Sequence, residues 1–538
     1  MEISISAFVI LSIIYFIAAH IGLYKIFEKI GIEGWKALVP FYSTYVAVKT
    51  VKKSWLWIIT YYVPFLGFVV WMGIIVELMK LLGKTSFKEH FLGIVFAGIY
   101  LPYIGFDKEV KFIGYEQAEK YQKPPSREWA DAIVFAIVAA TLIRGFYLEA
   151  FTIPTSSMEQ KLLRGDFLFV NKMAYGARVP NTPISFPFTH HSFPEWLPFV
   201  GGKKSYTELF KFPHAKLPKM GDVQRNDCVV FNFPAGDTVV LDAQNQIYDQ
   251  LVRENGRENL WKAHKIVYRP VDKRENYIKR CVGLPGDVIE VVDGVLKVNN
   301  QIAYQDPGVQ HNYIVNTQNF GFSKEVLVEK KINFEFPEEP FRDEAGNIIK
   351  DRSGEPLMFK HWNPIENQYR FTLTEEAKNK LLQFGNVAQL QQLIEKKDSL
   401  GFSDRNQIFP SSNYYNWTVD NFGPLTIPKK GVTVNLNEKT LPLYKNLITR
   451  YELHQLETKN NQIFIDGKPV TSYTFEMDYF WMMGDNRNNS QDSRYWGFVP
   501  ENHIVGKAVF VWMSYSPHPE DGGFFKRIRW DRLFTTVH

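Results

Sequence analysis

Long apolar runs mark the first part of the chain. Residues 5–24 and 55–79 each contain about enough apolar length to cross a bilayer as a helix. A shorter run follows at 91–106, and a fourth extends from Trp129 to about Ile143. In the first two runs, length and scarcity of charge favour membrane-spanning helices over helices buried in a globular core. The pattern therefore predicts three or four membrane segments before the chain changes character.

The distribution of Lys and Arg predicts an orientation for these segments. Residues 1–24 contain neither. Residues 25–53 are rich in Lys, and residues 107–128 contain several Lys together with Arg127. Because basic loops stay in the cytoplasm, the N-terminus is expected outside, and everything after about residue 145 on the outer face. The three lysines of the loop 80–88 run against this topology. The first segment is not expected to be a cleaved signal peptide, because no basic region precedes it.

From residue 151 onward, short strands replace the long runs. Alternation of apolar and polar residues, with Gly, Pro and Asn between the runs, predicts antiparallel β structure. The stretches concerned are DFLFVNK (166–172), DCVVFNF (227–233), NYIKRCVGL (276–284), DVIEVVDGVLKV (287–298), NQIFIDGKPV (461–470) and GKAVFVWMS (506–514). Helical spacing interrupts this pattern once. Thr374 is expected to cap EEAKNKLLQF, and a second helical stretch is predicted at 386–397.

Composition narrows the function classes. A net charge of +5 and a charged fraction of 22% indicate neither a nucleic-acid polycation nor a strongly charged tail. An aromatic content of 15% suits a membrane-interface or β-rich protein. Cys228 and Cys281 are too few for a disulfide framework, although one bridge between them is conceivable. The histidines form no HExxH or HxH pattern, so no metal site is predicted.

Two aromatic segments have two interpretations each. Residues 186–200 (FPFTHHSFPEWLPFV) suit a loop that dips into the bilayer interface, or equally a loop folded onto the domain's own core. The stretch 522–534 (GGFFKRIRWDRLF) mixes aromatics with Arg, and suits contact with anionic headgroups or cover for an edge strand.

The stretch PTSSMEQKLLRGD (154–166) contains a serine with two possible roles. Ser157 followed by Gln160 is typical of a capping box at the start of a helix. Taken alone, this spacing favours capping over catalysis. A catalytic role needs support from other parts of the chain.

That support comes from three separated stretches, 151–176, 276–289 and 482–508. Together they resemble the sequence boxes of bacterial type I signal peptidase, the leader peptidase, and GDNRNNSQDSRYWGFVP (484–500) is the most specific of them. The resemblance covers roughly residues 130–300 and 415–538. It implies a mainly β catalytic domain of antiparallel sheets, shared with repressor-type autoproteases, behind N-terminal transmembrane helices.

The resemblance implies a role for each matching residue. Ser157 falls on the nucleophile and Lys279 on the general base, while Thr155 and the backbone N–H of Ser157 fall on the oxyanion hole. Ser490 aligns with a hydroxyl that orients the lysine, and Asp492 with Arg494 aligns with a supporting ion pair. The positions that line the pockets for small residues at −1 and −3 are Phe151, Ile153, Leu162 and Ile278.

The chemistry requires a neutral lysine. A free ammonium has a pKa near 10.4, and burial among apolar side chains lowers that pKa because it disfavours the charged form. Strand alternation puts Tyr277, Lys279 and Cys281 on one face and Arg280 on the other. Lys279 can therefore face a packed interior.

The chain departs from the family in two places. Gln160-Lys161 stands where a Pro-Thr pair is usual, which alters the turn behind Ser157. Residues 305–415 show little resemblance and are expected to form an enlarged α+β version of the family's variable subdomain. The expected organisation is membrane segments and cytoplasmic loops at 1–128, the last membrane helix at 129–150, and a catalytic domain in two parts, 151–304 and 416–538.

These features predict a membrane-bound serine endopeptidase that removes signal peptides from exported preproteins after small residues. The resemblance implies no metal or organic cofactor. The expected partners are preproteins with signal peptides and the lipid bilayer, with the export machinery as a further candidate and no nucleic acid. The expected location is the bacterial inner membrane, in several passes, with the catalytic domain on the periplasmic face. The alternatives are a catalytically dead scaffold and a repressor-type Ser/Lys autoprotease, which the membrane segments and the GDNR box disfavour.

Overall fold

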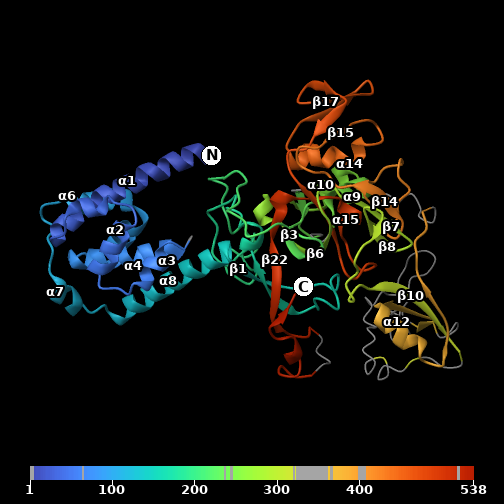
Figure 1. Cartoon of the computed structure of the whole chain (residues 1–538), viewed down its shortest axis with the longest axis horizontal. Coiled ribbons are helices and arrows are strands. Elements are labelled where there is room, and N and C mark those ends of the chain that lie inside the picture. Colours follow the sequence, from blue (N-terminus) through green and yellow to red (C-terminus); the bar gives the residue numbers. More distant parts are fainter. Residues whose placement is uncertain are drawn as a thin grey trace. The chain divides into compact units, whose positions relative to one another are not determined.

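The structure is a computed structural model that describes residues 5–63, 66–235, 238–242, 246–318, 322, 327, 362–363, 368–397, 407–517 and 522–537. The chain separates into two compact units (Figure 1). One unit comprises residues 1–149 and 176–219, and the other comprises 150–175 and 220–538. Each unit has its own hydrophobic clusters.

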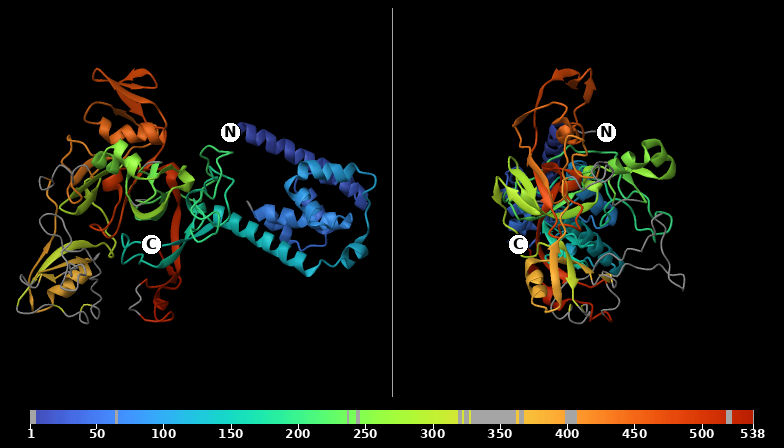
Figure 2. Two further views of the ribbon diagram at one scale, coloured as in Figure 1. Left: turned by 180° about the vertical axis from the view of Figure 1, so that it is seen from behind. Right: turned by 90° about the vertical axis from the view of Figure 1, so that its right-hand side faces the viewer.

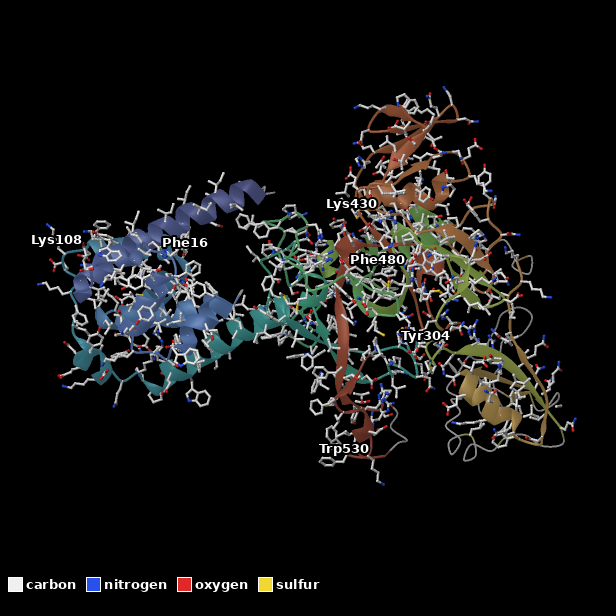
Figure 3. All side chains as sticks on the ribbon, viewed as in Figure 1. Phe16, Lys108, Tyr304, Lys430, Phe480 and Trp530 are labelled. Atoms are coloured by element: carbon white, nitrogen blue, oxygen red, sulfur yellow. The ribbon has the colours of Figure 1, made fainter. Side chains whose placement is uncertain are left out.

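The first unit contains the apolar helices. α1 (Ile5–Ile30) packs along α6 (Ala97–Phe106), and Gly22 lets the two backbones approach closely, since a Cβ there would overlap Leu101. Val9–Ile30 within α1 and Pro125–Phe146, which is α8, are long and apolar enough to cross a membrane. Many of their apolar side chains are exposed, such as Phe16 in α1 (Figure 3).

The second and third apolar runs do not form single straight helices. Residues 55–79 divide into α3 (Leu56–Tyr61) and α4 (Leu66–Leu81), and much of α4 is buried against neighbouring helices. The expectation of one spanning helix over 55–79 is therefore wrong. The run 91–106 lies in α5 (Phe87–Val95) and α6, which meet at a bend of 117°. That pair is a broken span or a re-entrant loop by length and composition.

The second unit is built around an antiparallel sheet that brings distant segments together. Its strand order is β1-β2-β22-β3-β6-β20-β21, and β23 (Thr535–Thr536) pairs with β22. The strands are β1 (Leu148–Thr152), β2 (Asp166–Asn171), β22 (Ile504–Ser514), β3 (Cys228–Asn232), β6 (Asn276–Gly283), β20 (Tyr479–Met483) and β21 (Val499–Pro500). The predicted strands of the catalytic region are confirmed, as is the mainly β fold class (Figure 2).

Both faces of this sheet are covered. Tyr277 and Cys281 of β6 join a cluster with Phe231 and Trp496, whereas Ile278 packs on the opposite cluster with Leu162 and Val230. The alternation predicted for β6 is therefore confirmed. Cys228 and Cys281 are both buried free thiols, so the conceivable bridge between them is not formed.

Smaller sheets flank the main one. β14 (Phe422–Thr426), β7 (Val288–Val292), β8 (Val295–Val298) and β9 (Gln301–Ile302) form a sheet whose core includes Trp481 of β20. β16 (Leu456–Lys459), β17 (Gln462–Ile465) and β18 (Lys468–Val470) form a three-stranded sheet. Within the segment 305–415, α12 (Glu375–Leu382) packs with a sheet of order β11-β12-β10-β13. Its strands are β11 (Trp362–Asn363), β12 (Gln368–Leu373), β10 (His311–Thr317) and β13 (Val387–Gln392).

The two helix predictions in this region have different outcomes. Thr374 accepts a hydrogen bond from the N–H of Ala377, so the predicted cap of α12 is confirmed. The helix predicted at 386–397 is wrong, because β13 occupies Val387–Gln392 and pairs with β10. The register shift opposite Asn316 and Thr317 leaves Ala388 unpaired, which puts Val387 and Leu390 on one side. The bulge thus imitates the spacing of a helix.

We predict that Gly165→Ala destabilises the second unit more than Gly431→Ala. Both glycines have left-handed φ, +88° and +78°, so alanine costs about 1–2 kcal/mol at either position. A Cβ at Gly165 would also overlap the carbonyl oxygen of Tyr515, which adds about 1–3 kcal/mol, whereas Gly431 faces open space. Thermal unfolding of the detergent-solubilised variants, followed by tryptophan fluorescence, measures the difference. Equal unfolding midpoints for the two variants would contradict the close approach at Gly165.

Candidate active site

Ser157 lies in a tight turn between β1 and β2. The turn spans residues 157–161, and no helix starts there, so the capping interpretation is wrong. Gln160 has a left-handed φ of +70°, which ends any helical path after one turn. The N–H of Leu162 donates to the carbonyl of Met158 at 2.7 Å and closes the turn. Ser157 is buried, and its carbonyl accepts a hydrogen bond from the N–H of Asn486 at 3.1 Å.

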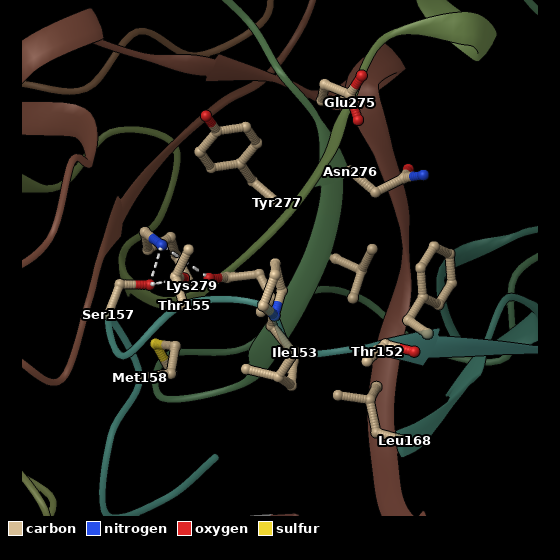
Figure 4. A pocket seen from close by; sticks show the side chains of 14 residues that line it. Thr152, Ile153, Thr155, Ser157, Met158, Leu168, Glu275, Asn276, Tyr277 and Lys279 are labelled. Atoms are coloured by element: carbon tan, nitrogen blue, oxygen red, sulfur yellow. Dashed lines mark hydrogen bonds between the residues drawn. The ribbon is translucent and has the colours of Figure 1, made fainter. Parts of the chain in front are cut away.

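Lys279 reaches this turn from the middle of β6. Its Nζ donates a hydrogen bond to Ser157 Oγ at 2.6 Å and another to the carbonyl of Ile278 at 3.1 Å (Figure 4). Only 3% of Lys279 is exposed, and Nζ lies 5.6 Å from the centre of the Tyr277 ring. Burial lowers the pKa of Lys279 to about 8, while Asp492 and Asp485 act in the opposite direction. Near neutral pH the amine can therefore lose its proton far more readily than a solvated lysine.

Thr155 stands on the same side of the turn as the serine hydroxyl. Its Oγ1 lies 3.4 Å from Ser157 Oγ, at the limit of a hydrogen bond. Both side chains line the same pocket as Lys279. A hydroxyl there can donate to an oxyanion that forms next to Ser157.

Ser490 is close to the pair but does not touch Lys279 through a hydrogen bond. Its buried Oγ has no hydrogen-bond partner among the described residues. Gly484 lies between the Ser490 hydroxyl and the carbonyl of Ser157, because a Cβ on Gly484 would overlap both. The structure therefore brings Ser490 beside the main chain of Ser157, without the lysine contact that the resemblance implies.

Asp492 and Arg494 form a buried bidentate ion pair. Arg494 Nε and Nη2 donate to the two carboxylate oxygens at 2.9 and 2.8 Å. Burial opposes ionisation, yet the Arg494 guanidinium holds the pKa of Asp492 below its usual value. Asp492 also accepts from the N–H of Gly484, and Arg494 donates to the carbonyl of Arg487. The pair thus fixes the 484–487 loop that contacts Ser157.

A second ion pair was not predicted from the sequence. Arg280 Nε and Nη2 each donate to a carboxylate oxygen of Asp485 at 2.7 Å, and both residues are buried. The signal was available, since alternation directs Arg280 away from Lys279 and a buried guanidinium needs a carboxylate. Because β6 pairs with β20, the residue after Gly484 is in reach of Arg280. This pair joins the lysine strand to the same loop that Asp492 and Arg494 fix.

A pocket of about 410 Å³ opens beside the Ser157–Lys279 pair (Figure 4). Phe151, Ile153 and Ile278 line this pocket, and all three are among the residues predicted to do so. Its other lining residues include Thr152, Met158, Leu168, Val230, Glu275, Asn276 and Tyr277. Leu162 requires a correction, because it is fully buried in the cluster behind the wall and does not line the pocket. The turn after Ser157 directs Leu162 into the same buried cluster as Met158 and Leu168.

Residues 160–161 and the first residues of the segment 305–415 meet in space. Asp306, at the start of the segment 305–415, lies 3.8 Å from Lys161 Nζ and 3.2 Å from Arg280 Nη2. Gly308 lies against Gln160, since a Cβ there would be 3.3 Å from that of Gln160. The turn after Ser157 and the start of the segment 305–415 therefore contact each other, and the Asp306 carboxylate offsets the charge of Lys161.

The fold, the apolar helices and the paired Ser157 and Lys279 are those of a membrane-associated serine endopeptidase. A family model described as "Signal peptidase, peptidase S26" matches residues 126–333 and 426–513, which is more than half of the chain. The chain belongs to this family. A second model, of a family of unknown function (DUF5684), matches residues 35–115.

Curated relatives agree with this assignment. The chain is 24% identical to signal peptidase I of Buchnera aphidicola subsp. Acyrthosiphon pisum, over 71% of this chain and 74% of the relative. It is 24% identical to signal peptidase I of Haemophilus influenzae, over 78% and 79% of the two chains. It is 22% identical to signal peptidase I of Pseudomonas aeruginosa, over 75% and 78%. The resemblance stated from the sequence boxes is confirmed.

We predict that Asp306 and Lys161 are energetically coupled. Asp306→Asn leaves the part-buried Lys161 without its nearest carboxylate and weakens the contact with Arg280, so kcat/KM should fall about tenfold. Lys161→Gln should cost less, and the double variant should be no worse than Asp306→Asn alone. Cleavage kinetics of all three variants test this double-mutant cycle.

The matched control pairs Asp306→Asn with Lys468→Gln, a change of an exposed lysine in β18. The changes in activation free energy caused by these two substitutions should add. If the changes in activation free energy caused by Asp306→Asn and Lys161→Gln also added, the two residues would not act as a pair.

Proposed function

We propose that Ser157 is the nucleophile and Lys279 the general base of a signal peptidase. One observation carries the proposal, the 2.6 Å contact between Ser157 Oγ and a buried lysine amine whose pKa is about 8. A serine hydroxyl attacks a peptide carbonyl only when a base takes its proton. Lys279 is the amine within reach, and its burial keeps it available in the neutral form.

The reaction runs in two halves. The neutral Lys279 amine takes the Ser157 proton as Oγ attacks the scissile carbonyl, and the resulting ammonium donates that proton to the leaving amine. The acyl-enzyme is then hydrolysed by a water that Lys279 deprotonates. The Thr155 hydroxyl and the backbone N–H of Ser157 stabilise the oxyanion in both halves. Asp492, Arg494 and Ser490 act as positioning residues for the loop behind Ser157.

Substrate recognition is assigned to the pocket beside the pair. Phe151, Ile153 and Ile278 form apolar walls that suit small residues at −1 and −3 of the cleavage site. Leu162 supports that wall from the core. The substrates are preproteins with signal peptides, which are apolar helices that the bilayer can deliver to the site.

The membrane arrangement is part of the same proposal. The basic loops favour a multi-pass protein of the bacterial inner membrane with the catalytic domain on the periplasmic face. Membrane segments and loops occupy 1–128, and α8 (Pro125–Phe146) overlaps the proposed last membrane segment, 129–150. The catalytic domain comprises 151–304 and 416–538, with 305–415 as its enlarged insert. The bilayer and the export machinery are the proposed partners besides preproteins.

We predict that Ser157→Ala and Lys279→Ala each lower cleavage by at least about 10³-fold, because either change removes one half of the reacting pair. Lys279→Arg should be equally inactive, since a guanidinium stays protonated. The measurement is cleavage of a preprotein with an A-x-A junction by purified full-length protein. Full activity in either alanine variant would contradict the dyad. A catalytically dead scaffold would instead show no cleavage by the wild type and unchanged preprotein binding by both variants.

The pH dependence follows from the lowered pKa of Lys279. The active form is the neutral amine, so kcat/KM should rise about tenfold per pH unit below pH 8 and level off above it. Asp492 raises the pKa of Lys279, so Asp492→Asn should move this limb to lower pH even if the maximal rate falls. The control, Asp466→Asn, changes an exposed carboxylate and should leave the limb in place. A limb that stays fixed in Asp492→Asn would show that another group titrates.

A further inference from the structure

Residues 176–219 form a long antiparallel excursion within the first unit. Bridges pair Arg178 with Lys216, Ser185 with Tyr206, and Ser192 with Lys204, so the chain runs out and returns beside itself. The N–H of Phe193 donates to the carbonyl of Lys203, and the N–H of Gly202 donates back to Phe193. The turn at 194–202 is therefore the tip of a hairpin. Figure 2 draws the segment in green, without helices.

The tip exposes large aromatic side chains. Trp196 is 79% exposed and Phe199 is 94% exposed, and further back Phe186 and Phe188 are each 56% exposed. Isolated exposed apolar residues are ordinary, but a group of bulky rings on one hairpin marks an interaction surface. The interpretation of 186–200 as a loop folded onto its own core is therefore wrong for these rings.

The backbone holds two of these rings in an unfavourable conformation. Phe188 has φ of +64° and Phe199 has φ of +66°, values that bulky residues rarely adopt. Such a conformation is unfavourable and is usually kept where it serves a function. The rings of Phe188 and Phe199 are both exposed, so the conformation does not serve to bury them. What it provides is their exposure.

Basic residues accompany the rings. Lys203 and Lys204 follow the tip directly and are exposed. The segment has six basic residues, Arg178, Lys203, Lys204, Lys211, Lys216 and Lys219, against two acidic ones, Glu195 and Glu208. Aromatic rings beside lysines are complementary to an interface of acyl chains and anionic headgroups. The same compact unit contains α1 and α8, the two helices able to cross a membrane.

We propose that the hairpin tip, residues 193–204, inserts into the interface of an anionic phospholipid bilayer. Trp196 and Phe199 enter the headgroup region, and Lys203 and Lys204 pair with lipid phosphates. The tip is thus a membrane contact in addition to the spanning helices. This proposal rests on the proposed function in one respect: the periplasmic location of the catalytic domain would make the contacted leaflet the outer one.

A probe at the tip of the full-length protein tests this contact. Phe199→Cys can be labelled selectively with an environment-sensitive fluorophore, because Cys228 and Cys281 are buried. Leu453→Cys, at a position 80% exposed in the second unit, is the matched control. Both proteins are reconstituted into phosphatidylcholine vesicles with about a quarter phosphatidylglycerol, some of them with nitroxide-labelled acyl chains.

The expected result is a blue-shifted tip probe, quenched by the nitroxide lipid about threefold more than the control probe. Raising the salt concentration or omitting phosphatidylglycerol should reduce the difference, because the lysines contribute through charge. Equal quenching of both probes would overturn the proposal. Shielding of the tip in native membranes but not in lipid vesicles would assign the surface to a protein partner and would also overturn it.

A second measurement separates this proposal from the proposed catalytic function. The double variant Trp196→Ser, Phe199→Ser should cleave a short soluble peptide in detergent as the wild type does. In vesicles it should cleave a membrane-inserted preprotein about fivefold more slowly. Unchanged cleavage in vesicles would overturn the role of the tip, whereas loss of peptide cleavage by the wild type itself would refute the catalytic proposal alone.

Discussion

The contact between the Lys279 amine and the Ser157 hydroxyl constrains the rest of the second unit. The two residues are 122 positions apart in the sequence. An amine that serves as the proposed base must be kept dry and away from a carboxylate that would hold it protonated. The main sheet meets both requirements. It places β6 between β3 and β20, so that Lys279 is covered from both sides, and it leads β1 directly into the turn that presents Ser157.

Among the described residues, Lys279 has no ion-pair carboxylate, whereas two neighbouring arginines do. Arg280 pairs with Asp485, and Arg494 pairs with Asp492, each through two hydrogen bonds. These buried pairs are costly to assemble, and breaking one would leave a charge unpaired. Both carboxylates are engaged by arginine, and they raise the pKa of Lys279 by less than its burial lowers it. The ion pairs therefore fix the loop and leave Lys279 with a lowered pKa, as the proposed base requires.

The sequence predicted local periodicity well and long-range partners less well. Alternation in NYIKRCVGL placed Lys279 in the interior, and the strands of the main sheet follow their apolar patterns. The bulge at Ala388 made a strand look like a helix in the sequence, because one extra residue turns the period of a strand into that of a helix. The Arg280–Asp485 pair and the link from Asp306 to Lys161 depend on which strands are neighbours, which spacing along the chain does not encode. The sequence placed Leu162 next to the pocket, but the turn at Gln160 points its side chain into the core and not into the pocket.

The adjacency of Ile278 and Lys279 in β6 has a mechanical consequence. One residue forms a wall of the pocket and the next carries the amine, so the two are separated by a single peptide unit. Any sliding or tilting of β6 moves the wall and the amine by nearly the same amount. The distance from a bound residue to the amine is thus insensitive to breathing of the sheet, whereas the turn at Ser157 is the part whose displacement changes the reacting geometry. Fluctuations that matter for turnover should therefore arise in that turn and in the loops that hold it.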